Sequence, residues 1–283
     1  MSEIINRIKE GTGEPFSFYQ DGYLYKLLMW FRIAMHKKNT SAVIIIDGRS
    51  GMGKTTFANQ VAVTIDENYG LAKMFYNPDD FIAGLSIAKK GDCLVFDEAM
   101  LISNRSTLSI INRMVVQAMS MIRSKKVCII FCVNSVFDLD KNLAISRADL
   151  LLHVFGDSLI DRGRFGAFFK PKGHQNRITQ LYILGKKFYD YSRPKANFVG
   201  RFSKEFVVDE NKYELQKQKG VNEFLNKKVG KLTIKAYATR NNLIRSLRAE
   251  GWSWEKLVEQ TGLNEKTIRQ ICDNKQNIDE NRV

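Results

Sequence analysis

The segment from residue 44 to residue 60, IIIDGRSGMGKTTFANQ, constrains the fold more than any other part of the chain. An apolar run leads into a glycine-rich turn, and the turn leads into a helix-compatible run that begins at Lys54. Gly48, Gly51 and Gly53 allow the backbone to turn its N–H groups inward, and the positive end of the following helix favours an anion there. The segment therefore predicts a strand, a phosphate-binding loop (P-loop) and a helix in succession.

Lys54 and Thr55 supply the chemistry that the outer phosphates of a nucleotide require. The Lys54 ammonium offers a positive charge, and the Thr55 hydroxyl is placed to bind Mg²⁺. A plain glycine-rich turn between strand and helix is the alternative, but such a turn needs neither the lysine nor the hydroxyl. We therefore expect ATP and Mg²⁺ as cofactors. The residues predicted to hold the nucleotide are Gly48, Arg49, Ser50, Gly51, Met52, Gly53, Lys54, Thr55 and Thr56.

The composition fits a globular protein with a polyanionic partner. The 283 residues leave room for one large domain and a smaller one, and 44% of them are hydrophobic. Lysines and arginines number 44 against 30 aspartates and glutamates, which gives a formal net charge of +14. This excess favours DNA or another nucleic acid as partner, with a solubilising surface and attraction to acidic lipids as the alternatives.

Cysteine usage and the lack of long apolar runs favour a cytoplasmic protein. Cys93, Cys128 and Cys132 lie inside apolar, strand-like runs, so we expect buried thiols in a reducing compartment rather than a metal site. The first residues are charged rather than signal-like, and no run of about eighteen apolar residues occurs. The sequence therefore predicts no membrane segment.

Helix-like and strand-like runs alternate along the first 156 residues. This alternation predicts an α/β fold with a mostly parallel sheet and helices on both faces. The expected strands cover residues 41–48, 71–77, 92–98, 127–135 and 150–156. The expected helices cover residues 23–38, 54–70, 78–91 and 107–126.

Polar residues follow two of these strands at the predicted loop edge of the sheet. The strand in CLVFDEAM ends in Asp97, whose carboxylate can hold Mg²⁺ or its water, and Glu98 follows directly. Asn134 stands at the end of the strand 127–135. The alternatives are solvated acids in a strand-to-loop turn for Asp97 and Glu98, and a turn-capping amide for Asn134.

The combination of this loop with Asp97 and Glu98 resembles the additional-strand class of P-loop ATPases, which have a RecA-like core. The resemblance implies the strand order 5-1-4-3-2, with the strand 127–135 between the loop strand and the Asp97 strand. It also implies that Glu98 polarises the water that attacks the γ-phosphate and that Asn134 is the polar sensor of that phosphate. Lys54 would complete the catalytic set together with an arginine.

That arginine is expected from a neighbouring subunit, where it stabilises charge in the transition state. Residues 40–156 resemble FtsK/HerA-type DNA motors and Zot-like viral or plasmid ATPases, and Arg123 matches the basic element before the sensor strand. A cation at a helix C-terminus is the alternative for Arg123. The resemblance implies a homo-oligomer, but not membrane export, because Zot-type exporters carry a membrane segment. The candidate arginines are Arg105, Arg113, Arg123 and Arg147.

Residues 241–274 predict two short helices separated by the turn TGLN. Gly262 falls where the turn needs a positive φ. The stretch resembles the helix-turn-helix of resolvase-like and sigma-like DNA-binding domains, which implies that Asn264 caps a recognition helix. A helical protein-docking domain is the alternative. The residues implied in DNA binding are Asn264, Lys266, Thr267, Arg269 and Gln270.

The predicted organisation has four parts. A helical segment covers residues 1–40, and the ATPase domain covers residues 41–208. From residue 157 this domain includes strands or a hairpin rich in aromatic and basic residues, which either line a nucleic-acid channel or serve as a β-extension or docking arm. Residues 209–228 are predicted to form a linker that can be helical, and residues 229–283 to form the helix-turn-helix domain.

Three function classes follow from these features. The leading one is an ATPase that moves or remodels DNA for translocation, packaging or replication in a virus or mobile element. The second is a helicase loader or initiator-like switch that hydrolyses ATP slowly. The third is a small-molecule kinase, because GRSGMGKTT also resembles a nucleoside-kinase loop, although a kinase needs neither the Asp97–Glu98 pair nor the DNA-binding-like tail.

Overall fold

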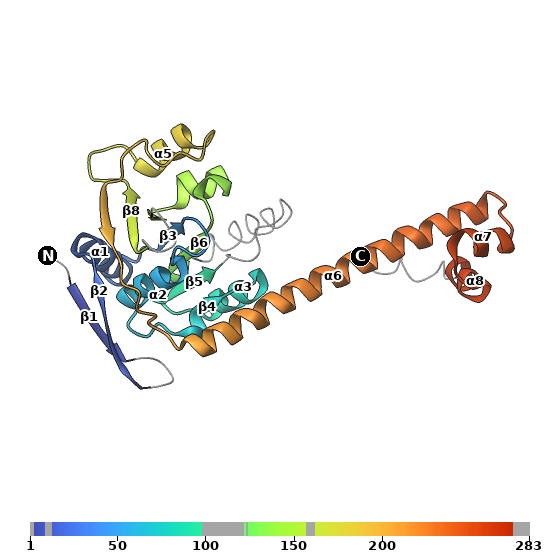
Figure 1. The fold of residues 1–283 in the computed structure, drawn as a ribbon, viewed down its shortest axis with the longest axis horizontal. Coiled ribbons are helices and arrows are strands. Elements are labelled where there is room, and N and C mark those ends of the chain that lie inside the picture. The colour runs from blue at the N-terminus through green and yellow to red at the C-terminus, as the bar shows by residue number, and fades with distance from the viewer. Residues whose placement is uncertain (1–2, 9–12, 98–121, 123, 157–161, 274–283) are drawn as a thin grey trace. The chain divides into compact units, whose positions relative to one another are not determined.

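The computed structural model describes residues 3–8, 13–97, 122, 124–156 and 162–273 (Figure 1). These residues divide into two compact units, Met1–Val221 and Asn222–Val283. We describe each unit by itself.

A seven-stranded sheet forms the centre of the first unit, in the order β4-β5-β6-β3-β7-β8-β9 (Figure 1). The strands from β4 to β7 in this order pair in parallel, whereas β8 and β9 are antiparallel to their neighbours. The prediction of a mostly parallel sheet is therefore confirmed. The strands are β3 Ala42–Asp47, β4 Met74–Phe75, β5 Cys93–Asp97, β6 Cys128–Val133, β7 Leu150–Phe155, β8 Arg164–Phe169 and β9 Phe198–Arg201.

Helices flank this sheet on both faces, because successive residues of a strand point to opposite sides. Ile44 and Ile46 share a buried cluster with Leu28 of α1 and with residues of α2. On the other face, the Phe81 ring of α3 packs edge-on against the Phe96 ring and at a tilt against the Phe131 ring, with centroid distances of 5.4 and 5.9 Å. The helices are α1 Gly22–Lys38, α2 Lys54–Ile65, α3 Pro78–Ile87 and α5 Arg177–Gly185, with short helical turns at η1 Leu71–Lys73, η2 Val136–Asp138 and η3 Asn142–Arg147.

The start of the chain differs from the predicted helical segment 1–40. Strands β1 Glu3–Ile8 and β2 Pro15–Gln20 form an antiparallel hairpin that is a sheet of its own (Figure 1). Phe16 and Phe18 alternate with exposed residues and are buried, which is the period of a strand rather than of a helix. Among the described residues up to residue 40, α1 alone is helical. It begins at the cap residue Asp21, whose carboxylate accepts the N–H groups of the first turn.

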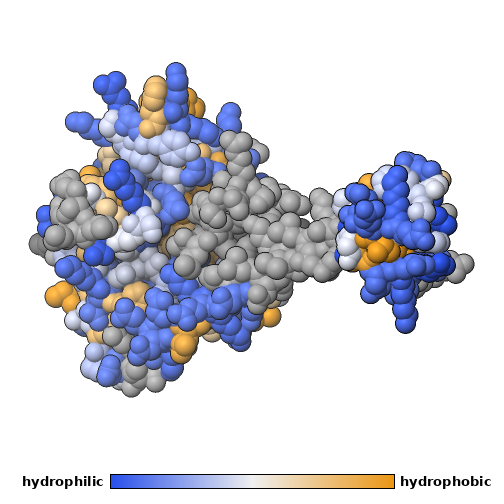
Figure 2. Space-filling model, turned by 45° about the vertical axis from the view of Figure 1, so that its right-hand side comes forward, coloured by the Kyte–Doolittle hydropathy of each residue, from blue (hydrophilic) through white to orange (hydrophobic). Residues whose placement is uncertain are grey.

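The second unit contains the later part of a long helix, α6 Glu210–Ala249, followed by α7 Trp254–Thr261 and α8 Glu265–Asp273. Its core is built from apolar side chains of the three helices. Figure 2 shows hydrophilic residues over most of the visible described surface of this unit. The segment 209–228, predicted as a linker, lies almost wholly in α6, and the boundary between the units falls after Val221. The buried core residues are Ile244, Leu257, Ile268 and Ile271.

No helix in the described parts of the chain is both long and apolar enough to cross a bilayer.

Candidate functional site

The loop after β3 adopts a backbone conformation that favours glycine at three of its positions. Gly51 and Gly53 have φ values of 79° and 91°, and Gly48 has a φ of 140°. A Cβ atom on Gly48 would lie 2.3 Å from the backbone oxygen of Val154, so no side chain fits there. Helix α2 begins at Lys54 without a side-chain cap, which leaves its first N–H groups facing the loop. This cradle of backbone donors suits an anion.

Lys54 and Asn134 meet inside this loop. Lys54 is 5% exposed, and its ammonium donates to the backbone oxygens of Gly48 at 2.6 Å and Arg49 at 3.1 Å. It also donates to the Asn134 amide oxygen at 3.2 Å. Burial lowers the pKa of Lys54 below its usual value, and the carboxylates of Asp97 and Asp47 oppose this shift. The ammonium thus lies where the predicted phosphate-binding residues converge.

Thr55, in the first turn of α2, and Asp97, the last residue of β5, also come together. Asp97 ends β5 and is 3% exposed, and its Oδ2 atom accepts a hydrogen bond of 2.9 Å from the Thr55 hydroxyl. A carboxylate beside a hydroxyl provides the hard oxygen ligands that Mg²⁺ prefers. No group of three or more His, Cys, Asp or Glu side chains that could hold a metal occurs among the described residues.

Asp97 has a further partner that the sequence did not predict. The Tyr213 hydroxyl, on the first turn of α6, donates to Asp97 Oδ2 at 3.3 Å. The Lys217 ammonium, one turn later, donates to the Tyr213 oxygen at 2.8 Å. Both residues fall in the segment 209–228, which was predicted to be a linker because its composition is polar. The few residues that make contacts there give no apolar pattern. The predicted linker therefore borders the site.

A second cluster missed from the sequence surrounds Asp47, the last residue of β3. Asp47 is fully buried and accepts the N–H of Val136 at 2.8 Å, while His153 Nδ1 lies 2.9 Å from its other oxygen. The Tyr191 hydroxyl also donates to it, and the Tyr191 ring stacks on the imidazole with centroids 3.6 Å apart. A cavity of about 410 Å³ adjoins this cluster and is lined in part by Gly48, Arg49, Asn134 and His153.

Another cavity of about 410 Å³ lies between the start of α2 and the residues next to β8 and β9, which form the extension of the sheet after β7. Arg162 donates to the backbone oxygen of Gly51 at 3.0 Å. The Phe202 ring stacks on Phe57 of α2 with centroids 4.3 Å apart. The extension after β7 is thus in contact with the loop. The lining residues are Met52, Gly53, Thr56, Arg162, Gly163, Phe202, Ser203 and Lys204.

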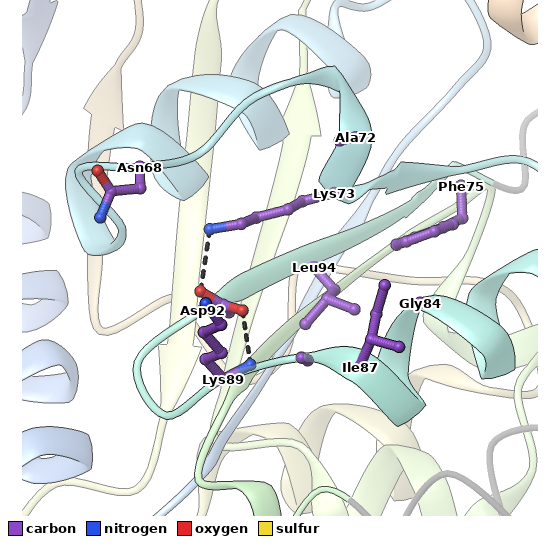
Figure 3. A pocket seen from close by; sticks show the side chains of 10 residues that line it. Asn68, Ala72, Lys73, Phe75, Gly84, Ile87, Lys89, Asp92 and Leu94 are labelled. Carbon is purple, nitrogen blue, oxygen red and sulfur yellow. Dashed lines mark hydrogen bonds and ion pairs between the residues drawn. The ribbon is translucent and has the colours of Figure 1, made fainter.

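A cavity of about 450 Å³ opens at the opposite end of β5 (Figure 3). Phe75, Ile87 and Leu94 form its apolar part, and Lys73 and Asp92, which pair at 3.0 Å, are among its polar lining residues. Asp92 precedes β5, whereas Asp97 ends that strand, so this cavity is separate from the loop.

Several predicted catalytic residues lie outside the described residues, namely Glu98, Arg105, Arg113 and Arg123. Arg147 is described and ends η3. It lines a cavity with Ser41 and Val43, at the amino end of β3. The loop follows the carboxyl end of that strand, so the structure does not bring Arg147 into the same chain's site.

The residues implied in DNA binding lie on α8 and the turn before it. Gly262 adopts a left-handed conformation with a φ of 66°, and Asn264 caps α8 by accepting the Thr267 N–H at 2.8 Å. Arg269 pairs with Glu265 at 2.6 Å and lies over the Trp254 ring. The exposed members of the set are Asn264, Lys266, Arg269 and Gln270, and Thr267 is half-buried.

Comparisons of the chain with protein-family models and with curated proteins give no match.

Proposed function

We propose that this protein is an ATP-hydrolysing P-loop protein that binds DNA and moves or remodels it. One observation carries the proposal. Two pairs, Lys54 with Asn134 and Thr55 with Asp97, converge at the carboxyl ends of β3, β6 and β5 around a loop built for an anion. In α/β proteins with an open parallel sheet, ligands bind outside the carboxyl ends of the strands.

The strand order supports a RecA-like core of the additional-strand class. β6 lies between the loop strand β3 and the Asp97 strand β5, with β7 on the far side of β3. If β3 to β7 are numbered 1 to 5 along the chain, the sheet read from β7 to β4 has the order 5-1-4-3-2. This is the order that the resemblance implies, and it supports the proposal. An extra strand between the two motif strands places Asn134 at the loop, where its amide oxygen meets Lys54.

Each residue of the site has a role in this proposal. Backbone N–H groups of the loop hold the phosphates, and Lys54 neutralises the outer ones. Thr55 and Asp97 would hold Mg²⁺, which supplies charge stabilisation when bound. Asn134 contacts the γ-phosphate. Glu98, the residue after β5, orients the attacking water.

DNA binding is proposed for the second unit. The helix α8 follows a glycine turn and presents Lys266 and Gln270 to solvent, as a recognition helix requires. The net charge of +14 supports a polyanionic partner. We also propose a homo-oligomer, because the arginine that completes the ATP site is expected from a neighbouring copy.

Nucleotide binding is the first test of this proposal. We expect Lys54→Ala to weaken binding of a fluorescent ATP analogue at least about tenfold, because a charge-assisted hydrogen bond is worth about 1.5–3 kcal/mol. The matched control is Lys186→Ala, whose ammonium contacts Tyr182 away from the loop. Equal affinities for the two variants would contradict the assignment of the loop.

A further inference from the structure

The first turns of α6, residues 210–220, pack within the first unit beside Asp97. Gln216 Nε2 donates to the backbone oxygens of Leu71 and Met74, each at 3.2 Å. Gly220 allows a close approach, because a Cβ atom there would lie 3.1 Å from the Cβ of Tyr76. These contacts hold the start of α6 against the segment from η1 to β4.

A directed hydrogen-bond chain runs from this helix to the predicted metal ligand. An ammonium group only donates, so the Tyr213 oxygen accepts from Lys217 and its own proton points to Asp97. Thr55 donates to the same carboxylate oxygen. Asp97 is therefore held in one orientation by two elements, α2 and α6. Such outer partners fix the direction of metal-binding carboxylates.

A second buried phenol lies next to this chain. Tyr76 is 4% exposed, and its hydroxyl has no hydrogen-bond partner among the residues described. Its ring centroid is 6.0 Å from that of Tyr213. Burial raises the pKa of both tyrosines, so both stay neutral. Mg²⁺ keeps several waters when bound, and the Tyr76 hydroxyl oxygen is available to accept a hydrogen bond from such a water.

We propose that Tyr213 is a positioning residue of the magnesium site, so that binding of the metal and nucleotide strengthens the docking of residues 210–220. This inference rests on the proposed function. The helix that begins at this contact continues beyond Val221 into the residues of the second unit. Nucleotide binding thereby acts on the segment that joins the ATP site to the DNA-binding unit.

The test compares Tyr213→Phe with Tyr182→Phe, an equally buried tyrosine whose hydroxyl donates to Leu139 away from the loop. A fluorescent, slowly hydrolysed ATP analogue is titrated with Mg²⁺. We expect Tyr213→Phe to raise the Mg²⁺ midpoint about tenfold, as loss of an outer partner does. Affinity for the analogue in EDTA stays as in the wild type. Tyr182→Phe changes neither quantity.

Hydrogen exchange supplies a readout that does not depend on turnover. In the wild type, Mg²⁺ with the analogue slows exchange in residues 210–220, and Tyr213→Phe reduces this protection. Gln216→Ala loosens the same docking without touching Asp97 and is expected to raise the Mg²⁺ midpoint as well. An unchanged midpoint in both folded variants overturns the inference. A wild-type protein that does not bind the analogue with Mg²⁺ refutes the proposed function, and the inference with it.

Discussion

Asp47 shows at the scale of a single residue how a buried carboxylate fixes the edge of the site. Its partners Val136, His153 and Tyr191 lie 89, 106 and 144 residues further along the chain. The sequence predicts the strand that ends in Asp47 because its residues are apolar, but nothing local indicates these partners. Because all three partners are far away in the sequence, no local motif could have predicted the role of Asp47.

We expect Asp47→Ala to lower the free energy of unfolding by about 3 kcal/mol, because the substitution removes an acceptor shared by three buried or half-buried donors. Urea denaturation followed by circular dichroism measures the change. Asp190→Ala is the control, since Asp190 is exposed. A loss below about 1 kcal/mol in Asp47→Ala would contradict the role given to the cluster.

At the scale of elements, the sequence predicted the buried parallel strands well. β3, β5 and β6 are buried at every position, and each is an apolar run, ended in β3 and β5 by a single aspartate. Docking of α6 was not predictable in the same way. Its contacts with the rest of the first unit come from single residues about one turn apart, such as Tyr213 and Gln216, and exposed residues separate them. So narrow a stripe gives no clear helical period.

Lys73 joins η1 to the start of β5, and its pH dependence is predictable. Its ammonium pairs with Asp66 at 2.6 Å and with Asp92 at 3.0 Å. Burial alone would lower the pKa of Lys73, but the two carboxylates raise it above the usual value. A raised lysine pKa gives stability that is complete below the unfolded value of about 10.4 and is lost as pH rises through the folded value.

We therefore expect Lys73→Met to lower the free energy of unfolding at pH 7 by about 2 kcal/mol, because Asp66 and Asp92 lose their charged partner. The gap between the variant and the wild type should stay constant up to about pH 10 and narrow only above it. Denaturation at a series of pH values measures this. Lys89→Met, at an exposed neighbouring lysine, serves as control. A gap that closes below pH 9 would count against the pairing.

At the scale of the whole molecule, we propose that the first unit binds nucleotide and the second unit binds DNA. Lys266→Gln is expected to weaken DNA binding and to reduce the dependence of log affinity on log salt by about one unit, since one phosphate contact is lost. Electrophoretic shifts at several salt concentrations measure both effects. Nucleotide affinity should not change. If Lys172→Gln, at an exposed lysine of the first unit, has the same effect, the DNA site lies elsewhere or is diffuse.

The most direct test of the account is ATP hydrolysis by the full chain, measured with and without duplex or single-stranded DNA. We predict phosphate release that requires Mg²⁺ and is faster with DNA. We also predict that Glu98→Gln still binds ATP but hardly turns it over, because the attacking water is no longer activated. Absence of hydrolysis under both conditions, or transfer of the γ-phosphate to a nucleoside, would contradict the assignment as a DNA-directed ATPase.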